Sequence, residues 1–298
     1  MPPPKPALAY ALLTLAALFW TGNWVVGRML ADLVPPSALT FWRWAIALAL
    51  LLPFVGPRLW AARSLLVREW RPIVALGLLG GGLHNVLQYW GLDYTLATNG
   101  AILNATTPVL IIVLGTLLFR DPFPRRAAAG AFIALAGTLA LITRLDYAML
   151  ASVGPNRGDL LIFVSMVMLS GYTVGLRRRP SGLDPFSFLA CFAIVALVPV
   201  GIGYAIEHAA GLRIVLNPTS IGGMLYIAVF PALLAYLFWD IGVRAVGAAR
   251  AGVFMYLMPV FGSALGMALL GERFALYHAV GMGLIFAGVA IATRVRRA

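Results

Sequence analysis

The chain has 298 residues, of which 62% are hydrophobic and 11% charged, and its mean hydropathy is +0.93. Soluble domains carry roughly 25% charged residues, so this chain has too few polar side chains to cover a water-soluble globule. The net charge of +12 is spread over many short connections rather than along one stripe, which argues against nucleic acid as a partner.

Apolar runs of membrane-spanning length recur along the whole chain. A spanning helix needs about 20 apolar residues, and the alternating pattern of barrel strands is not visible. The sequence therefore predicts an all-α integral membrane protein with ten transmembrane helices in contact with the lipid bilayer. The predicted spans are residues 8–30, 37–55, 72–92, 98–119, 127–143, 158–176, 186–206, 219–239, 250–270 and 277–293.

The basic residues fall mainly on one side of these spans. With the N-terminus inside, 16 of the 22 Lys and Arg residues lie in inner segments and five in outer segments, and Arg43 lies within a span. This asymmetry follows the positive-inside rule and predicts cytoplasmic N- and C-termini. The first span is too long for a signal-peptide core, so we expect it to be retained.

Trp20, Asn23 and Trp24 share one stripe of the first span, because their spacing follows the helical period. Both tryptophans lie past the middle of the span. Two indoles beside an amide could form a stacking wall for a planar ligand, or they could face lipid or pack in the core.

Arg43 lies about two turns inside the second span. Its planar guanidinium could hold a substrate carboxylate. We favour instead a side chain that snorkels outward or binds the carbonyls of a helix end.

The third span carries the stretch HNVLQYW (84–90) in an otherwise apolar run. We expect His84, Asn85, Gln88 and Tyr89 to share one face, directed away from lipid because polar groups there are costly. They follow Gly80-Gly81-Gly82, where helix geometry can loosen. We interpret them as the lining of a cavity, and the alternative is that they join neighbouring helices by hydrogen bonds.

Pro108 and Pro259 each remove a helical hydrogen bond, in the fourth and ninth spans. We interpret the two prolines as kinks that shape an inner and an outer gate, although packing alone could require them. Side chains nearby could bond to the freed carbonyls or contact substrate: Asn104, Thr106, Thr107 and Tyr256.

The two halves of the chain resemble each other. ATTPVLIIVLGTLLFRDPF (105–123) aligns with YLMPVFGSALGMALLGERF (256–274) at an offset of 151, and earlier residues match at an offset of 149, which pairs Asn23 with Tyr172. We therefore predict one five-helix repeat in residues 1–150 and a second in residues 151–298. Five is an odd number, so the repeats must be inverted, an architecture typical of secondary transporters.

Two motifs resemble the EamA family of the drug/metabolite transporter superfamily. FWTGNWVVGRM (19–29) is similar to the first-helix motif of that family, and the stretch 256–274 resembles its ninth-helix signature. The chain also looks like the aromatic amino-acid exporters of the family. This resemblance implies a transporter of metabolites such as amino acids.

All ten acidic residues, Asp240 among them, fall in connections or at predicted span ends. Proton-driven pumps commonly use carboxylates inside the membrane, and only His84 could titrate near the midplane. Related small multidrug exporters carry a carboxylate in helix one, where this chain has Asn23. We therefore expect gradient-driven movement, with proton coupling through His84 as the alternative.

The sequence shows neither metal-ligand spacing nor a phosphate-binding glycine loop, so we expect no enzyme, catalytic residue, metal or cofactor. The predicted function is export of small molecules across a bacterial plasma (inner) membrane by alternating access. Aromatic and polar candidates together suit a zwitterion with an aromatic or apolar side chain. Two alternatives stay open: a phosphate-ester or nucleotide-sugar carrier, which would need more basic residues than Arg43 in its cavity, and an intramembrane enzyme.

Overall fold

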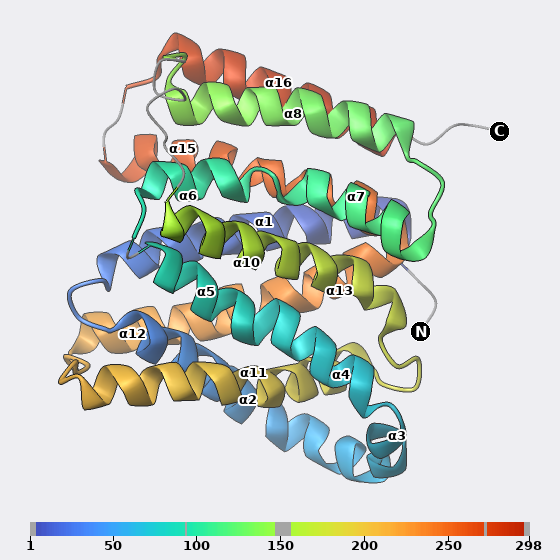
Figure 1. The fold of residues 1–298 in the computed structure, drawn as a ribbon, viewed down its shortest axis with the longest axis vertical. Helices are drawn as coiled ribbons and strands as arrows, with labels where there is room; N and C mark the ends of the chain where they lie inside the picture. Colours follow the sequence, from blue (N-terminus) through green and yellow to red (C-terminus); the bar gives the residue numbers. More distant parts are fainter. Residues whose placement is uncertain (1–3, 93, 147–155, 271–272, 295–298) are drawn as a thin grey trace.

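A computed structural model describes residues 4–92, 94–146, 156–270 and 273–294. Every regular element in these ranges is helical. The long helices lie side by side, with α8 and α16 at one edge of the bundle and α2 and α11 at the other (Figure 1). The structure is thus all-α.

In its described residues, the first half of the chain contains eight α-helices and one π-helical segment between α4 and α5. They are α1 Pro6–Met29, α2 Pro36–Ala61, α3 Arg63–Arg68, α4 Trp70–Gly77, the π segment Leu78–Gly82, α5 Leu83–Leu92, α6 Ala97–Asn104, α7 Thr107–Phe119 and α8 Arg125–Thr143.

The second half has the same kinds of element, with a π-helical segment between α12 and α13. They are α10 Arg157–Gly175, the 3-10 turn Leu176–Arg178, α11 Pro185–Ala209, α12 Pro218–Ile227, the π segment Ala228–Leu234, α13 Ala235–Val246, α14 Ala248–Val253, the 3-10 turn Phe254–Tyr256, α15 Leu257–Leu270 and α16 Leu276–Thr293.

Local sequence signals begin many of these helices. Proline occupies the first turn of α1, α2, α11 and α12, where its missing N–H has no helical partner to lose. Asn156 and Asn217 cap α10 and α12 by accepting backbone N–H groups of the first turn. Two helices end at residues in the left-handed conformation, α7 at Arg120 and α8 at Arg144.

Nine helical segments in the described ranges are long and apolar enough to cross a membrane. They correspond to nine of the ten predicted spans. The remaining one is the continuous helical segment Trp70–Leu92, where His84, Asn85 and Gln88 lower the apolar character. In Figure 1 this segment crosses the bundle from end to end beside α10.

The predicted boundaries miss several helix ends and interruptions. Helix α2 continues to Ala61 although it contains Pro53 and Pro57, where the prediction ended the span at residue 55. Helix α13 continues to Val246, seven residues beyond the predicted end. The fourth span is broken between α6 and α7.

Helices from the two halves pack against each other in antiparallel pairs. The carboxylate of Glu207, near the end of α11, accepts the N–H groups of Ser37 (2.8 Å) and Ala38 (3.1 Å) in the first turn of α2. At the opposite ends of these helices, Arg58 lies 3.9 Å from Asp184. Helices α8 and α16 contact backbone to backbone at Gly130 with Gly288 and at Gly137 with Gly281. Further cross-half contacts join α1 to α13 and α5 to α10.

Candidate functional site

The π-helical segment Leu78–Gly82 brings the third predicted span close to the second half. A Cβ on Gly80 would lie 2.5 Å from the Tyr172 ring, and one on Gly81 would lie 2.5 Å from the Phe192 ring. The Gly80 carbonyl accepts a hydrogen bond from the Tyr236 hydroxyl at 2.8 Å. The glycines thus allow aromatic side chains of α10, α11 and α13 to pack against this backbone.

Arg43 points into this region and does not snorkel outward. The side chain is buried, with 5% exposure, and it donates to Asn85 Oδ1 at 2.6 Å. The Asn85 amide in turn donates to the Gly81 carbonyl at 2.7 Å. The expected snorkelling is therefore wrong, because Asn85 on α5 supplies a polar partner inside the bundle.

The Arg43 guanidinium is not neutralised by a carboxylate in the described part of the chain. Its Nε atom is buried and has no hydrogen-bond partner there, and the same holds for the indole nitrogen of neighbouring Trp44. The Arg43 guanidinium also lies 5.4 Å from the centroid of the Trp44 ring. A buried cation with an open donor is complementary to an anionic group.

Aromatic rings enclose this polar centre. Tyr236 contacts the Trp44 ring (5.0 Å between centroids), the Phe192 ring (5.2 Å) and the Trp20 ring (5.6 Å). Trp20 also lies 5.1 Å from Trp239. We call the following set the central cluster: Trp20, Arg43, Trp44, Asn85, Tyr172, Phe192, Tyr236 and Trp239.

His84 makes a different contact from Asn85. Its Nδ1 atom lies 2.7 Å from the Ser165 hydroxyl on α10, and that hydroxyl bonds to the His84 carbonyl at 3.0 Å. The side chain is buried. His84 therefore joins α5 to α10, as in the alternative interpretation of the third span.

The other residues predicted for the first and third spans are only partly enclosed. Asn23, Gln88 and Tyr89 are half-buried and Trp24 is exposed. In the described residues, no hydrogen bond joins Tyr89 to the central cluster, so its predicted role as lining stays a prediction. Within the same part of the chain, Trp24 and Asn23 form no hydrogen bond or ring contact with that cluster, so their predicted role as lining also stays a prediction.

The two matched prolines stand at helix breaks. Pro108 lies in the first turn of α7, just after the break that follows α6, and Pro259 lies in the first turn of α15, just after the 3-10 turn Phe254–Tyr256. Asn104 and Thr106 donate to the carbonyls of Gly100 (2.9 Å) and Leu103 (2.7 Å). Neither acceptor is the Asn104 carbonyl, four residues before Pro108, so the predicted bonding to a freed carbonyl stays a prediction.

Two further polar residues near these breaks behave differently. Thr107 donates to the Met166 sulfur on α10 at 3.1 Å. The buried Tyr256 hydroxyl has no hydrogen-bond partner among described residues. The expectation that Tyr256 bonds to freed carbonyls is wrong, although the open hydroxyl keeps it a candidate for substrate contact.

An acidic residue inside the bundle escaped the sequence analysis. Asp240 lies within α13 and forms an ion pair with Arg179, with 4% and 3% of the two side chains exposed. The predicted span ended at residue 239, so Asp240 counted as a span end. The interpretation that every acidic residue lies in a connection or at a span end is therefore wrong for Asp240, because α13 continues to Val246.

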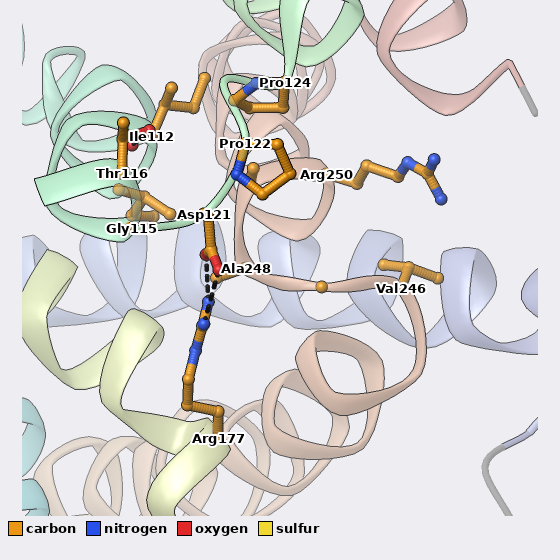
Figure 2. Close-up of a pocket in the computed structure, with 13 residues that line it drawn as sticks. Ile112, Gly115, Thr116, Asp121, Pro122, Pro124, Arg177, Val246, Ala248 and Arg250 are labelled. Carbon is orange, nitrogen blue, oxygen red and sulfur yellow. Dashed lines mark hydrogen bonds and ion pairs between the residues drawn. The ribbon is translucent and has the colours of Figure 1, made fainter. Parts of the chain in front are cut away.

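A cleft of about 240 Å³ lies at the end of the bundle where α7 and α13 end. Asp121 and Arg177 form a two-bond ion pair at its edge (2.9 and 2.5 Å), and Arg250 extends away from that pair (Figure 2). The hydrogen bonds from Arg177 hold the pKa of Asp121 below its ordinary value of 3.8. This cleft is separate from the central cluster.

The fold and composition define a multi-pass helical membrane protein, and comparison with known proteins gives its family. The model of the EamA-like transporter family matches residues 7–143 and again residues 156–294. The chain therefore belongs to the EamA-like transporter family.

Curated relatives extend over nearly the whole chain. "Uncharacterized transporter YyaM" of Bacillus subtilis (strain 168) is 25% identical over 289 residues, covering 97% of this chain and 94% of that protein. An "Uncharacterized transporter" of Archaeoglobus fulgidus is 26% identical and covers 95% of this chain and 96% of its own length. "Protein PecM" of Dickeya dadantii is 27% identical over 74% of this chain and 73% of its own length. These names support a membrane transporter and give no substrate.

A solved crystal structure shares the fold. It superposes with a TM-score of 0.77 over 97% of both chains, at 20% sequence identity. At that identity the likeness shows the arrangement of helices alone.

Proposed function

We propose that the protein exports small metabolites, and amino acids including aromatic ones in particular, by alternating access between two inverted five-helix repeats. In this proposal the membrane is a bacterial plasma (inner) membrane and both termini are cytoplasmic. Substrate moves down its gradient. The segment Trp70–Leu92, which is third in chain order, also crosses the membrane and completes the ten spans.

Pairs of contacts related by exchange of the two halves support the inverted repeat. The alignment equates Gly130 with Gly281 and Gly137 with Gly288. The contact of Gly130 with Gly288 therefore becomes, on exchange, the observed contact of Gly281 with Gly137. Such reciprocal contacts are the mark of a two-fold axis.

The interrupted helices repeat in the same way. The π segment Leu78–Gly82 packs on α11, and the π segment Ala228–Leu234 packs on α2, where α2 and α11 are the second helices of the two halves. In transporters with inverted repeats, discontinuous helices meet near the midplane and form the substrate site. The central cluster contacts the first π segment through the hydrogen bond from the Tyr236 hydroxyl to the Gly80 carbonyl, which supports a site beside these segments.

The observation that carries the substrate class is the buried Arg43 guanidinium, whose described side-chain partner is the neutral amide of Asn85. A cation in this position is costly unless it is paired, and a substrate carboxylate would pair it. The surrounding indole and phenol rings offer surface for an aromatic or apolar side chain. An aromatic amino acid presents both groups.

A counterflow assay tests this proposal directly. Purified protein in proteoliposomes is loaded with each of the twenty amino acids in turn, and uptake of labelled phenylalanine is measured. We expect aromatic amino acids to drive the largest uptake. Uptake that is driven by none of the twenty, or equally by liposomes without protein, would overturn the proposal.

A phosphate-ester or nucleotide-sugar carrier is tested in the same vesicles. Such substrates carry two or more negative charges, and Arg43 is the one basic side chain that the structure places in the central cluster. We expect sugar phosphates to drive no counterflow. An enzyme would form product in detergent solution, where a carrier has no gradient to dissipate.

A further inference from the structure

The ion pair of Arg179 with Asp240 differs from the other ion pairs of the described chain by its burial. The remaining three pairs join side chains that are 34% to 74% exposed, whereas these two are 3% and 4% exposed. Arg179 also donates to the Leu183 carbonyl at 2.9 Å. Arg179 Nε and Asp240 Oδ1 keep no hydrogen-bond partner in the described residues.

The Arg179–Asp240 ion pair connects two separate pairs of packed helices. Helix α13, which carries Asp240, packs on α1 through Gly242 against Leu13. Helix α10, which leads into Arg179, packs on α5 through Gly158 against Gly91. We call these the α1–α13 pair and the α5–α10 pair, and each combines one helix from each half of the chain.

Contacts between the two pairs are polar near this end of the bundle. Trp239 donates from its indole nitrogen to the Thr173 hydroxyl at 3.3 Å, one turn from the ion pair. At the corresponding positions of the first half, 149 residues earlier, Asp240 is replaced by Gly91 and Arg179 by Leu30. In the described part of the chain, the ionic connection therefore exists at one end of the bundle and is not repeated at the equivalent positions Gly91 and Leu30.

A buried ion pair costs more to separate in a closed bundle than in an open, hydrated one. Removing two charges from water is expensive, and an apolar pair of similar volume is often as stable. When the pair separates within a closed bundle, each charge loses its partner without gaining water. When it separates because that end opens, water hydrates both charges.

We propose that the Arg179–Asp240 pair is a latch that holds the inner end of the transport pathway closed in this conformation. It fastens the α1–α13 pair to the α5–α10 pair and is released when the inner end opens. The inference rests on the proposed alternating access. Its specific content is that a charge contact stabilises the closed inner end, whereas the equivalent positions at the outer end, Gly91 and Leu30, carry no charge.

Cysteine accessibility in the absence of substrate tests the latch. In a Cys191→Ala background, Val243→Cys reports on the inner end, one turn beyond Asp240 and buried at 4% exposure. Ala38→Cys reports on the opposite end and is fully buried. The rate of reaction with a membrane-impermeant maleimide is measured for each, in vesicles of either orientation.

We expect Asp240→Asn to raise the labelling rate of Val243→Cys about tenfold or more, without raising that of Ala38→Cys. Asp121→Asn is the matched control. It removes the carboxylate of another ion pair at this end, which joins the connection after α7 to the 3-10 turn after α10 and does not link the α1–α13 pair to the α5–α10 pair. We expect it to leave both rates unchanged.

The charge-swapped variant Arg179→Asp with Asp240→Arg restores the ion pair in reverse, and we expect it to return the labelling rate towards that of the parent. Equal labelling in Asp240→Asn and its parent would overturn the latch, and so would a rise at both reporter positions. Because no substrate is added, these outcomes are independent of the counterflow assay. A protein that exports amino acids but labels unchanged would refute the latch alone.

Discussion

At the scale of single residues, two neighbours in the third span have different partners. Adjacent residues on a helix point about 100° apart, so His84 reaches Ser165 on α10 while Asn85 reaches Arg43 on α2. The sequence indicated that these polar groups turn away from lipid. It could not show which of them meets a fixed partner, because that depends on where the neighbouring helices lie.

Arg43→Gln should reduce phenylalanine counterflow at least tenfold. A hydrogen bond to a charged group contributes about 1.5–3 kcal/mol, and the substitution removes the charge while it keeps a polar side chain. Arg63→Gln, at an exposed position of α3, is the matched control and should transport normally. Transport by Arg43→Gln at the parental rate would exclude Arg43 from substrate binding.

His84→Ala should lower stability rather than change the driving force. The His84–Ser165 contact joins two membrane helices, and such bonds contribute about 0.6–2 kcal/mol. Ser165→Ala should lower the free energy of unfolding by a similar amount. The double variant should lose less than the sum of the two single losses, because both substitutions remove the same contact. Thermal unfolding in detergent measures the three values.

Counterflow should respond little to an imposed pH gradient, and a strong response that disappears in His84→Ala would show proton coupling instead.

The stability that the Asp121–Arg177 ion pair contributes should fall at low pH, because the pKa of Asp121 is lowered in the folded protein. A carboxylate whose folded pKa is depressed stabilises the fold above its unfolded pKa, and this contribution is lost as the pH falls through the folded pKa. The difference in melting temperature between the parent and Asp121→Asn should therefore be the same at pH 7 and pH 5. This difference in melting temperature should disappear only below pH 3.8, because the folded pKa of Asp121 lies below that value. A difference already lost at pH 5 would contradict the assigned ion pair.

At the scale of helices, apolar run length predicted where spans lie but not where they are interrupted. Pro108 and Pro259 indicated kinks in two spans, and helix breaks occur beside both. The glycine triplet suggested loosening and becomes a π-helical segment. The corresponding segment Ala228–Leu234 contains Pro231 instead of a glycine triplet, and it packs on α2.

Gly80→Ala should destabilise the protein by roughly 1–3 kcal/mol, the usual cost of overpacking. The added methyl would lie 2.5 Å from the buried Tyr172 ring, which has no free space to move into. Gly283→Ala on α16 is the control, because no atom lies within 4 Å of its new Cβ. That variant should be neutral or stabilised by the better helix propensity of alanine. Equal melting temperatures for the two variants would contradict the close packing at Gly80.

At the scale of the whole molecule, composition was sufficient to predict a helical membrane protein, and the family match agrees with it. The internal alignment predicted two inverted repeats, and reciprocal contacts such as Gly130 with Gly288 support them. The ion pair of Asp240 could not be predicted, because its partner Arg179 is 61 residues away in the sequence. Long-range pairing of this kind is set by how α10 and α13 pack, which hydropathy does not encode.

The central claim is that two like repeats lie in opposite directions across the bilayer. The last turn of α2 and the connection that follows α11 lie at corresponding places in the two repeats, and each offers an exposed position, Trp60 (73% exposed) and Leu212 (49% exposed). In the Cys191→Ala background, Trp60→Cys and Leu212→Cys are labelled with an impermeant maleimide in intact cells and after permeabilisation. Trp60→Cys should react only after permeabilisation and Leu212→Cys already in intact cells. Reaction of both from the same side of the membrane would contradict the inverted repeat and the transport mechanism built on it.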